Sequence, residues 1–587
     1  MNIIGWSGFE NAMAFKEGEM PGLDIREYRI VQGQDSAAAL IVDGEIVAAA
    51  EEERFNGQKH SGAFPEGAIR YCCEQAGIDV SEVDAFVHAF DYSAYKIHHT
   101  RTELSKRRYK DVYSREALLE FMQRSLPEVD NCDDKFVQLE HHIAHAASAY
   151  YTSGWDECLV GVLDGMGEVH GITIWHAKNG EMNNLHRQSA DHSLGVLYSL
   201  VTLHLGFDFN SDEYKIMGLA PYGDPEKYRA FFDEHVEFLD DGGLRIPILG
   251  LNKTPQEREI YERTREYLAE HLIAARDPND EVEDDHRDVA AALQQCLNKA
   301  INHVCSHFAK ATGLRRLAMA GGVALNCTAN GKLLESGLFD EIYVQPAAGD
   351  DGAALGAALA LAAVRDKVNN ERMAVPFFGP SYSEEQIEAV IAQYADRIDV
   401  QRFDSLEDTS QAAAKSIADG QVISWFRGRA EFGPRALGHR SILADPGNPE
   451  MRDRVNAMVK MREAFRPFAP AVTQETAHQW FEVEEGQELP YMIFIVRVRE
   501  AYRDALPAIT HVDGTARLQT VSPETGPEFY TLLKHVGKET GREMLLNTSF
   551  NVKGQPMVNS PKEAIETFLG TGIDVLFLEN AAIRRPG

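Results

Sequence analysis

Short apolar runs that alternate with helical stretches constrain the fold of this chain more than any other feature. Strand-like runs are expected at 85–89, 135–140, 157–164, 316–322 and 341–346, and helical stretches separate them, notably at 142–151 and 289–312. Residues 38–49 carry Asp43 and Gly44 between two apolar runs, which predicts a β-hairpin. Strands separated by helices build an α/β sheet rather than a sandwich. We therefore expect the α/β fold class.

Glycine-containing turns follow these runs in a suggestive order, at 33–36, 164–167, 320–323 and 349–352. Glycines at strand ends let the backbone approach a ligand closely, and acidic residues there can hold a metal ion. Loops of this kind face one cleft in a two-lobed actin/Hsp70/sugar-kinase-like domain. On this interpretation the nucleotide-binding residues of the domain are Gly165, Gly167, Gly321, Gly322 and Asn326.

A second domain is expected after the apolar stretch that ends at Val364. Residues 365–383 are polar and then rich in proline and glycine, as in a linker. We place the boundary near residue 375, which gives domains 1–375 and 376–587.

The charge balance restricts the partners of this chain. It has 58 Lys and Arg residues against 91 Asp and Glu residues, a net charge of −33. Nucleic-acid binding requires basic side chains that neutralise phosphates, so no nucleic-acid partner is expected. The longest apolar run, 352–364, is shorter than the roughly 20 residues that cross a bilayer, so no membrane partner is expected either.

The seven cysteines show no CxxC spacing, so zinc ribbons and disulfide scaffolds are excluded. Their apolar or helical surroundings predict reduced, buried thiols. The N-terminus lacks the pattern of a secretory signal. We expect a cytoplasmic protein, and the sequence leaves the presence of a homodimer open.

His141 and His145 are four residues apart in a stretch with helical character. On a helix this spacing places both imidazoles on one face, where they can share a metal ion. Carboxylates are available from Asp164 and from the adjacent pair Asp350 and Asp351. Two imidazoles with one or two carboxylates suit a six-coordinate divalent ion such as iron(II) or manganese. The alternative is a helix whose histidines merely pack or cap.

A basic segment stands out in the second domain. Residues 427–466 carry nine Lys and Arg residues against five acidic residues, a net charge of +4. Such a reversal within an acidic chain indicates a focused anion site. Arg435, Lys460 and Arg466 are its best candidates for phosphate recognition, and Arg517 and the stretch 545–551 add further donors. The alternative is a basic surface helix paired with neighbouring acids.

Taken together, the motifs identify a family. HHIAHAASAYY, GVLDGMGE, KIMGLAPYG, AGGVALNC, AGDDGAALGAA, GPRALGHRSILADP, REAFRPFAPAV and LLNTSFN occur in this order between residues 33 and 560. The chain thus resembles the O-carbamoyltransferases of the nodulation-protein-U and cephamycin type. The resemblance implies an N-terminal two-lobed actin/Hsp70-like (Kae1-like) domain and a C-terminal YrdC-like α/β domain.

The resemblance also implies an activity. The YrdC-like domain would form carbamoyl-adenylate from carbamoyl phosphate and ATP, with Mg as the partner of ATP. The Kae1-like domain would bind iron(II) or another divalent ion and transfer the carbamoyl group to a hydroxyl of a small, secondary-metabolite acceptor. Carried over by motif, the metal ligands are His141, His145, Asp164 and Asp351, with Asp350 as the second choice in that turn. The carbamoyl-phosphate and adenylate site comprises Arg435, Lys460, Arg466, Arg517, Asn547 and Ser549, of which Arg435 and Lys460 are also expected to be catalytic.

The chain departs from the family at Gln34, where relatives usually carry a histidine. Glutamine cannot accept a proton at neutral pH. If a base is needed there, Asp35, Lys59 or His60 would have to supply it. Residues 7–29 resemble an insertion that could cover the mouth of the acceptor cleft.

Two other functions remain open at this point. A fused tRNA-threonylcarbamoylation enzyme would share both domains, although the net charge opposes tRNA binding. From a different class, the chain could be a nucleotide-binding regulatory protein without activity. Hydrogenase-maturation carbamoyltransferases carry CxxC zinc fingers, which are absent from this sequence.

Overall fold

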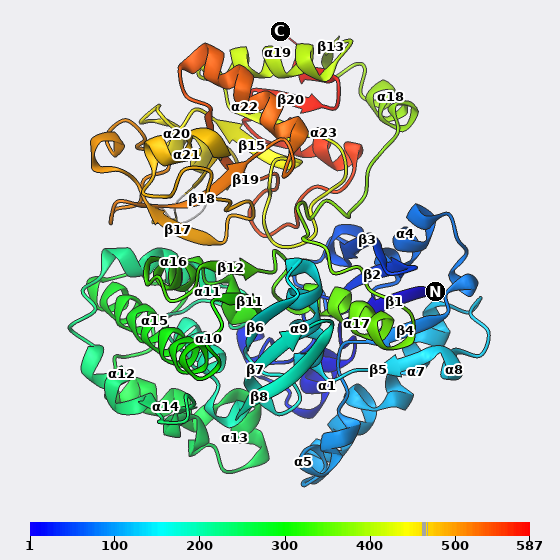
Figure 1. Cartoon of the computed structure of the whole chain (residues 1–587), viewed down its shortest axis with the longest axis vertical. Coiled ribbons are helices and arrows are strands. Elements are labelled where there is room, and N and C mark those ends of the chain that lie inside the picture. Colours follow the sequence, from blue (N-terminus) through cyan, green and yellow to red (C-terminus); the bar gives the residue numbers. More distant parts are fainter. Residues whose placement is uncertain (461–464, 467, 587) are drawn as a thin grey trace. The chain divides into compact units, whose positions relative to one another are not determined.

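The computed structural model describes residues 1–460, 465–466 and 468–586, apart from the side chain of Lys460 (Figure 1). The chain forms two compact units. Unit 1 comprises Met1–Glu53 and His60–Met373, and unit 2 comprises Arg54–Lys59 and Ala374–Gly587.

The first sheet of unit 1 has the strand order β3-β2-β1-β4-β5. Its strands are β1 (Asn2–Trp6), β2 (Ala37–Val42), β3 (Glu45–Glu51), β4 (Ala85–His88) and β5 (Phe136–Gln138). β2 pairs antiparallel with β1 and β3, and the turn between β2 and β3 is the predicted hairpin at Asp43 and Gly44. β1, β4 and β5 run parallel, so β4 and β5 end at the same edge of the sheet.

The second sheet of unit 1 repeats this plan with the order β12-β11-β6-β7-β8. Its strands are β6 (Glu157–Leu163), β7 (His170–Lys178), β8 (Glu181–Ser189), β11 (Arg316–Ala320) and β12 (Glu341–Val344). β7 pairs antiparallel with β6 and β8, whereas β6, β11 and β12 run parallel. Unit 1 therefore contains one sheet topology twice.

Two helices link the sheets of unit 1 (Figure 1). α17 (Asp350–Arg365) packs on β1 and β2, and α9 (His141–Ser153) packs on β6 and β11. The two helices also pack on each other, and a Cβ at Gly356 would lie only 1.8 Å from the carbonyl oxygen of Ala144. Only glycine allows this approach. Because both residues lie in the first two turns of their helices, the N-terminal ends of α9 and α17 come close together.

The other helices surround the sheets. In unit 1 they are α1 (Ala12–Glu19), α2 (Ile25–Tyr28), α4 (Glu66–Ala76), α5 (Lys96–His99), α6 (Glu103–Arg108), α7 (Arg115–Ser125), α8 (Cys132–Lys135), α10 (Leu194–His204), α11 (Glu213–Leu219), α12 (Arg229–His235), α13 (Pro255–Ile260), α14 (Glu262–His271), α15 (Asp284–Thr312) and α16 (Cys327–Glu335), while α3 spans Glu53–Asn56. A small ribbon pairs β9 (Glu237–Phe238) with β10 (Leu244–Arg245). None of the helices in the described part of the chain is long and apolar enough to cross a membrane. All seven cysteines are buried free thiols, as predicted.

Unit 2 is built on one mixed sheet with the order β13-β21-β20-β14-β15-β19-β16-β18-β17. Its strands are β13 (Asp399–Arg402), β14 (Ile423–Phe426), β15 (Arg440–Ala444), β16 (Ala469–Thr473), β17 (Phe494–Arg497), β18 (Thr515–Val521), β19 (Met544–Ser549), β20 (Val575–Leu578) and β21 (Ala581–Arg584). Its helices are α18 (Glu384–Gln393), α19 (Leu406–Ala418), α20 (Met451–Val455), α21 (Gln474–Trp480), α22 (Pro527–Thr540) and α23 (Pro561–Gly570).

The core of unit 2 lies between this sheet and the helix pair α19 and α22. Leu443 and Leu545 face the helices from the sheet, and Ile417 and Leu532 face the sheet from the helices. In both units, helices pack on the faces of β-sheets. This arrangement confirms the predicted α/β fold class.

Candidate functional site

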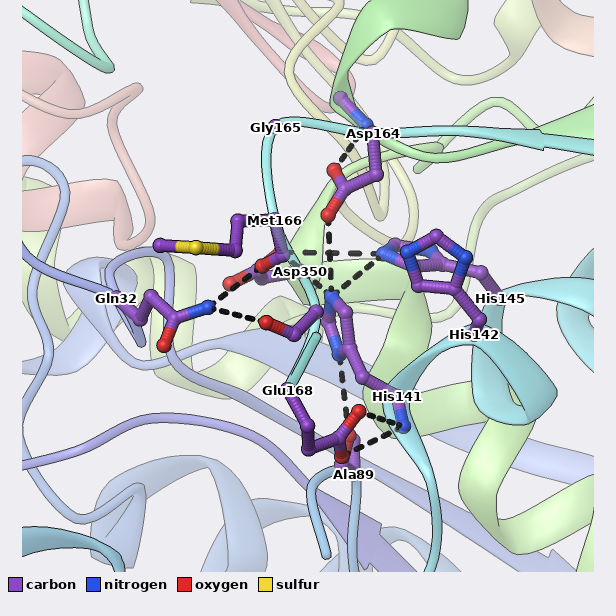
Figure 2. Close-up of polar contacts among 12 residues, drawn as sticks. Gln32, Ala89, His141, His142, His145, Asp164, Gly165, Met166, Glu168 and Asp350 are labelled. Carbon is purple, nitrogen blue, oxygen red and sulfur yellow. Dashed lines mark hydrogen bonds and ion pairs between the residues drawn. The ribbon is translucent and has the colours of Figure 1, made fainter. Parts of the chain in front are cut away.

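Four side chains of unit 1 converge where α9 and α17 begin (Figure 2). They are His141 and His145 on α9, Asp164 directly after β6, and Asp350 at the first turn of α17. Nε2 of His141 lies 3.0 Å from Nε2 of His145, 3.4 Å from an oxygen of Asp350 and 3.6 Å from an oxygen of Asp164. One nitrogen or oxygen atom from each of the four residues lies within 4.8 Å of the other three.

Hydrogen bonds fix the orientation of the first imidazole. Nδ1 of His141 lies 3.1 Å from the carbonyl oxygen of Ala89, which can only accept, so Nδ1 carries the hydrogen. The backbone N–H of His141 donates to the carboxylate of Glu168 at 3.0 Å. Nε2 of His141 is therefore directed at the two aspartates, as in metal-binding histidines that are oriented through their other nitrogen.

The glycine-rich turns of the second sheet hold Asp164. The backbone N–H of Gly322 donates to Oδ1 of Asp164 at 2.9 Å, so the turns after β6 and β11 meet at this carboxylate. On the other side of the turn after β6, the amide of Gln32 donates to the carbonyl oxygens of Met166 and Gly167 at 2.7 and 2.8 Å (Figure 2).

The other residues predicted to bind nucleotide surround these turns. Gly165 and Gly167 follow Asp164, Gly321 precedes Gly322, and Asn326 lies a few residues further along the chain at the start of α16. The Asn326 side chain accepts from the N–H of Ala329 at 2.9 Å and exchanges hydrogen bonds with Gln294 at 3.0 Å. Asn326 thus caps a helix and positions Gln294.

Burial and close charges shift the pKa values of these groups in opposite directions. Burial lowers the pKa of His141, but Asp350 and Asp164 outweigh burial and hold this pKa well above its ordinary value. Burial and the neighbouring His141 lower the pKa of His145 to about 3. Burial raises the pKa of Asp350, whereas for Asp164 the hydrogen bond from His141 and the adjacent imidazoles overcome burial and lower the pKa.

The donor set fits a divalent metal ion. Two imidazole nitrogens and two carboxylate oxygens converge in a buried place where only one imidazole is available to offset the negative charge. Buried charges of one sign require pairing or a metal ion. Mixed imidazole and carboxylate ligands suit iron(II) or manganese, and the buried cysteine thiols contribute no ligand to this cluster.

The turn at the start of α17 presents Asp350 to the cluster, and not Asp351, which the family pattern placed first. Asp351 accepts the N–H of Gly352 at 2.9 Å, and its pKa is raised well above the ordinary value by burial and by the charges of Glu51 and Asp35. Successive residues at a helix start point about 100° apart, so only one of two adjacent carboxylates can face α9. The second choice, Asp350, is the residue that the structure brings to the histidines.

Asp35 lies beside the departure at Gln34. Its Oδ1 is 2.7 Å from Nδ1 of His60, and the backbone N–H of His60 donates to Glu53 at 2.9 Å. Asp35 and His60 both adopt positive φ values, 59° and 56°, which are costly for residues other than glycine and are often found at functional sites. Gln34 is buried, and Lys59 is exposed in the segment that groups with unit 2.

A loop before β15 presents the predicted anion-binding residue Arg435 in unit 2. Glu431 is 1% exposed, and its Oε1 accepts the backbone N–H groups of Leu437, His439 and Arg440 at 2.8, 2.9 and 3.2 Å. One buried carboxylate therefore closes the loop on itself. Arg435 lies half-buried within the closed turn.

Two buried amides join this loop to the sheet. Asn547 donates to the carbonyl oxygen of Ala436 at 3.1 Å and to Oε1 of Gln519 at 2.9 Å. Gln519 in turn donates to the carbonyl oxygen of Leu437 at 2.9 Å. Asn547 is fully buried, so its NH₂ group holds the loop in place. We call Glu431, Gln519 and Asn547 the loop brace.

Two of the remaining predicted residues of unit 2, Arg517 and Ser549, lie on the same face of the sheet. Side chains two residues apart on a strand point to one face. Arg517 precedes Gln519 by two positions on β18, and Ser549 follows Asn547 by two positions on β19, so both share the face of the brace. Arg466 is half-buried, and the Lys460 side chain lies outside the described residues.

Part of the basic segment is used inside the protein. The guanidinium of Arg440 is buried over the ring of Phe426 at 3.6 Å and donates to backbone carbonyl oxygens. Arg427 pairs with Glu528 at 3.2 Å, and Arg454 pairs with Asp574 at 2.8 Å. The charge count alone did not show that these cations have partners within the protein.

Sequence reasoning missed Glu431, Gln519 and Glu168. In the sequence Glu431 is only one negative charge within a basic segment, and no spacing marks a side chain that accepts hydrogen bonds from three loop amides. The roles of Gln519 and Glu168 depend on contacts between distant parts of the chain. Only the role of Gln519 could have been inferred from the sequence, because a residue two positions after Arg517 on a strand lies on the same face of the sheet.

Comparisons with known proteins match both units. The family described as "Carbamoyltransferase N-terminus" matches residues 30–359, and the family described as "Carbamoyltransferase C-terminus" matches residues 414–585. Nodulation protein NolNO of Sinorhizobium fredii is 40% identical over 557 residues, which cover 94% of this chain and 79% of that protein.

Two further relatives extend the comparison. Nodulation protein NolO of Bradyrhizobium diazoefficiens is 44% identical over 450 residues, which cover 76% of this chain and 79% of that protein. The 3'-hydroxymethylcephem-O-carbamoyltransferase of Streptomyces clavuligerus is 36% identical over 250 residues, which cover 42% of this chain and 45% of that protein.

Proposed function

The chain belongs to the carbamoyltransferase family and is a transferase enzyme, and we propose that it is an ATP-dependent O-carbamoyltransferase. Carbamoyl phosphate donates the carbamoyl group, and ATP donates the adenylyl group that activates it. The acceptor is a hydroxyl of a small, secondary metabolite. The named O-carbamoyltransferase among its relatives supports transfer to oxygen. The observation that carries the proposal is the convergence of two histidines and two aspartates at the start of α9 and α17, within a matched family domain.

We assign the two half-reactions to the domains 1–375 and 376–587. The repeated sheet topology of unit 1 supports a two-lobed actin/Hsp70-like (Kae1-like) domain for transfer. The mixed sheet of unit 2, with its braced loop, would be the YrdC-like domain that makes the adenylate.

In the first half-reaction, carbamoyl phosphate loses inorganic phosphate with uptake of water. The carbamate oxygen then attacks the α-phosphorus of ATP, forming carbamoyl-adenylate and releasing pyrophosphate. Arg435, Lys460, Arg466 and Arg517 would bind the anionic groups, because guanidinium and ammonium groups are the usual partners of phosphates. Negative charge develops on the transferred oxygens, so donors fixed in advance lower the barrier. The loop brace would supply that fixation for Arg435.

In the second half-reaction, the acceptor oxygen bonds to the carbamoyl carbon, and AMP leaves with the bonding electrons. Asp35, paired with His60, would receive the proton of the hydroxyl, with Lys59 as the nearby cation in the sequence. His141, His145, Asp164 and Asp350 would hold iron(II) or another divalent ion, which supplies Lewis acidity when bound. The glycine turns at Asp164 and Gly322 would bind the nucleotide part of the adenylate.

The test measures the two half-reactions separately. The native chain is incubated with ATP, Mg²⁺, carbamoyl phosphate and iron(II), and pyrophosphate release is followed. Small hydroxylated compounds are then added, and mass spectrometry searches for a gain of one carbamoyl group. Release of ADP without pyrophosphate would overturn the adenylate step, and a carbamoylated amine without any carbamoylated hydroxyl would overturn the proposed acceptor class.

A further inference from the structure

A second basic segment, in unit 1, has no part in the proposed function. Residues 96–115 carry seven Lys and Arg residues against two acidic residues, a net charge of +5 within a chain of −33. This segment is half the length of 427–466 and more strongly charged. It forms α5, α6 and the start of α7 (Figure 1). Arg107, Arg108 and Arg115 pair with acidic residues of other segments, so the exposed positive charge of the segment lies mainly on Lys96, Arg101 and Lys110.

The two ends of this segment line a cavity of about 470 Å³. Its wall is formed by residues 91–96, 109–116 and 136–138. A volume of this size is within the range of small-molecule sites, roughly 300–1,000 Å³. β4 ends three residues before Asp91, and β5 itself lines the wall, so the cavity lies at the carboxyl ends of two parallel strands. Ligands of α/β sheets bind at such edges.

The cavity offers charges of both signs that other parts of the protein do not use. The ammonium of Lys96 lies 5.3 Å from the centre of the Tyr109 ring, and among the described residues it forms no ion pair. In that part of the chain the carboxylates of Asp91 and Glu116 form no ion pair either, although Oδ1 of Asp91 accepts the backbone N–H of Ser93 at 2.9 Å. Arg115 also lines the cavity, but it is committed to Asp133 at 3.0 Å. The ligand therefore meets one available cation and two available carboxylates.

The cavity wall is joined directly to the metal-binding cluster. The backbone N–H of Asp91 donates to Glu168 at 2.8 Å, and the same carboxylate accepts the N–H of His141. The amide of Gln138 donates to the carbonyl oxygen of Phe90 at 3.3 Å, and the Phe90 ring stacks on the imidazole of His141 at 3.8 Å. A molecule that contacts Asp91 or Gln138 in the cavity would thus be separated from His141 by one further buried residue on each path, Glu168 or Phe90.

We propose that this cavity binds the part of the acceptor that lies away from the reacting hydroxyl, and that this part is a hydroxylated anion, such as a phosphorylated or carboxylated sugar. The anionic group would face Lys96, where the surrounding basic segment strengthens the attraction. Hydroxyl groups would donate to Asp91 and Glu116, since a purely anionic ligand would be repelled by these carboxylates. The inference rests on the proposed function, because it names the substrate class of the same transfer domain.

Direct binding to the full chain tests this inference. Calorimetry is run with glucose 1-phosphate, glucuronate, glucose and inorganic phosphate as probes. We expect the two anionic sugars to bind at least about tenfold more tightly than glucose or phosphate alone, because only they satisfy both kinds of groups. Lys96→Ala should weaken the anionic sugars by roughly tenfold or more. Glu116→Gln should weaken glucose, which depends on the carboxylate as an acceptor, while phosphate should bind at least as tightly as before because one repelling charge is removed. Lys106→Ala, an exposed change in the same basic segment that does not line the cavity, is the matched control.

Several outcomes would overturn the inference. If neither anionic sugar binds the native chain, the cavity does not take this class. Equal affinity for glucose and glucose 1-phosphate would remove the anionic requirement, and equal losses in Lys96→Ala and Lys106→Ala would place binding on the general surface charge. Pyrophosphate release by the native chain is measured in parallel. Its absence would remove the proposed function while leaving the binding result intact.

Discussion

The histidine–aspartate cluster of unit 1, a candidate metal site, and the braced loop of unit 2 are built in opposite ways. In unit 1 the candidate ligands are imidazoles and carboxylates that point at one another from the ends of helices and strands. In unit 2 the predicted substrate-binding residue Arg435 lies on a turn. The buried side chains of Glu431, Gln519 and Asn547 fix this turn by hydrogen bonds. The arrangement in unit 1 can be predicted from the spacing of its residues in the sequence. The arrangement in unit 2 depends on residues that position Arg435 without contacting the ligand themselves.

This difference predicts how each site fails. Removal of one member of the unit 1 cluster takes away a metal ligand directly. Removal of one member of the brace leaves every ligand present and alters only its position.

His141→Ala should strongly weaken metal binding and carbamoyl transfer, because it removes one of four proposed ligands and leaves the buried carboxylates without a neighbouring imidazole that offsets their charge. We expect bound metal to fall by about 10-fold to 100-fold and transfer by roughly 10³-fold or more. Pyrophosphate release should persist, since that step is assigned to the other domain. Metal content is measured by mass spectrometry of the holoenzyme, and the half-reactions are assayed separately.

His142→Ala is the control for loss of a buried imidazole on the same helix. His142 faces Thr173, 3.0 Å from its hydroxyl, and lies outside the cluster. The control should lose stability but keep its metal. Parallel loss of metal in both variants would mean that packing of α9, and not ligation, holds the ion.

Arg435→Ala should lower pyrophosphate release by about 10²-fold, which corresponds to roughly 2.7 kcal/mol of transition-state stabilisation. The reason is that a guanidinium on a closed loop is lost where a dianion must be bound. Arg452→Ala is the matched control, because Arg452 belongs to the same basic segment but is half-exposed and pairs with Asp453 at 3.1 Å. If both variants lose the same activity, the site depends on the net charge of the segment and not on the loop.

Asn547→Leu should act through position alone. It leaves the carbonyl oxygen of Ala436 and the side chain of Gln519 without a donor, and each buried unpaired group costs about 1–3 kcal/mol. We expect a loss of about 3 kcal/mol in the free energy of unfolding and a roughly tenfold loss of pyrophosphate release. The loss should be in kcat more than in KM for carbamoyl phosphate.

Asn547→Gln retains an amide and should recover part of the activity lost in the leucine variant. A KM effect alone, with normal kcat and stability, would instead make Asn547 a direct substrate ligand, as the family pattern suggested. The two substitutions together therefore decide whether this residue belongs to the brace or to the binding site.

The same contrast explains what could be predicted from the sequence. The α/β class, the hairpin at Asp43 and the facing pair His141 and His145 follow from periodicities of two and 3.6 residues, which local chemistry enforces. The choice between Asp350 and Asp351 depends on the exact phase of α17, and a single residue changes the direction of the side chain by about 100°. Local patterns do not fix that phase.

The role of Glu431 could not be predicted for a different reason. Its three acceptor contacts exist only after the loop has closed, and nothing in the local sequence distinguishes this carboxylate from a surface charge. The basic segment 96–115 was within reach of a charge count, which singled out only the segment in unit 2. The sequence does not show the cavity beside this segment, which is formed by residues from distant parts of the chain.

The smallest effect concerns charge within the two units. Unit 2 buries Arg440, whose guanidinium keeps its charge at every accessible pH, whereas unit 1 buries the titratable carboxyl of Glu52. Glu52 accepts the N–H groups of Gly67 and Ala68 at the start of α4, but burial outweighs these bonds and raises the pKa from 4.5 to about 7. Between these two values the folded state holds a proton that the unfolded state has lost. The stability of unit 1 should therefore fall as the pH rises through this window.

Glu52→Gln removes this titration and should flatten the fall. The pKa difference corresponds to about 2 kcal/mol between pH 5 and pH 7.5, so the variant should gain about that much relative to the native chain as the pH rises. Urea unfolding of both proteins at the two pH values, with Glu74→Gln on the exposed side of α4 as the control, measures the difference. A gain that is equal at both pH values would mean that the substitution changes packing alone. A gain in the free energy of unfolding that appears only at pH 7.5 would show that folded unit 1 binds a proton at Glu52. Arg440 in unit 2, by contrast, stays charged at both pH values.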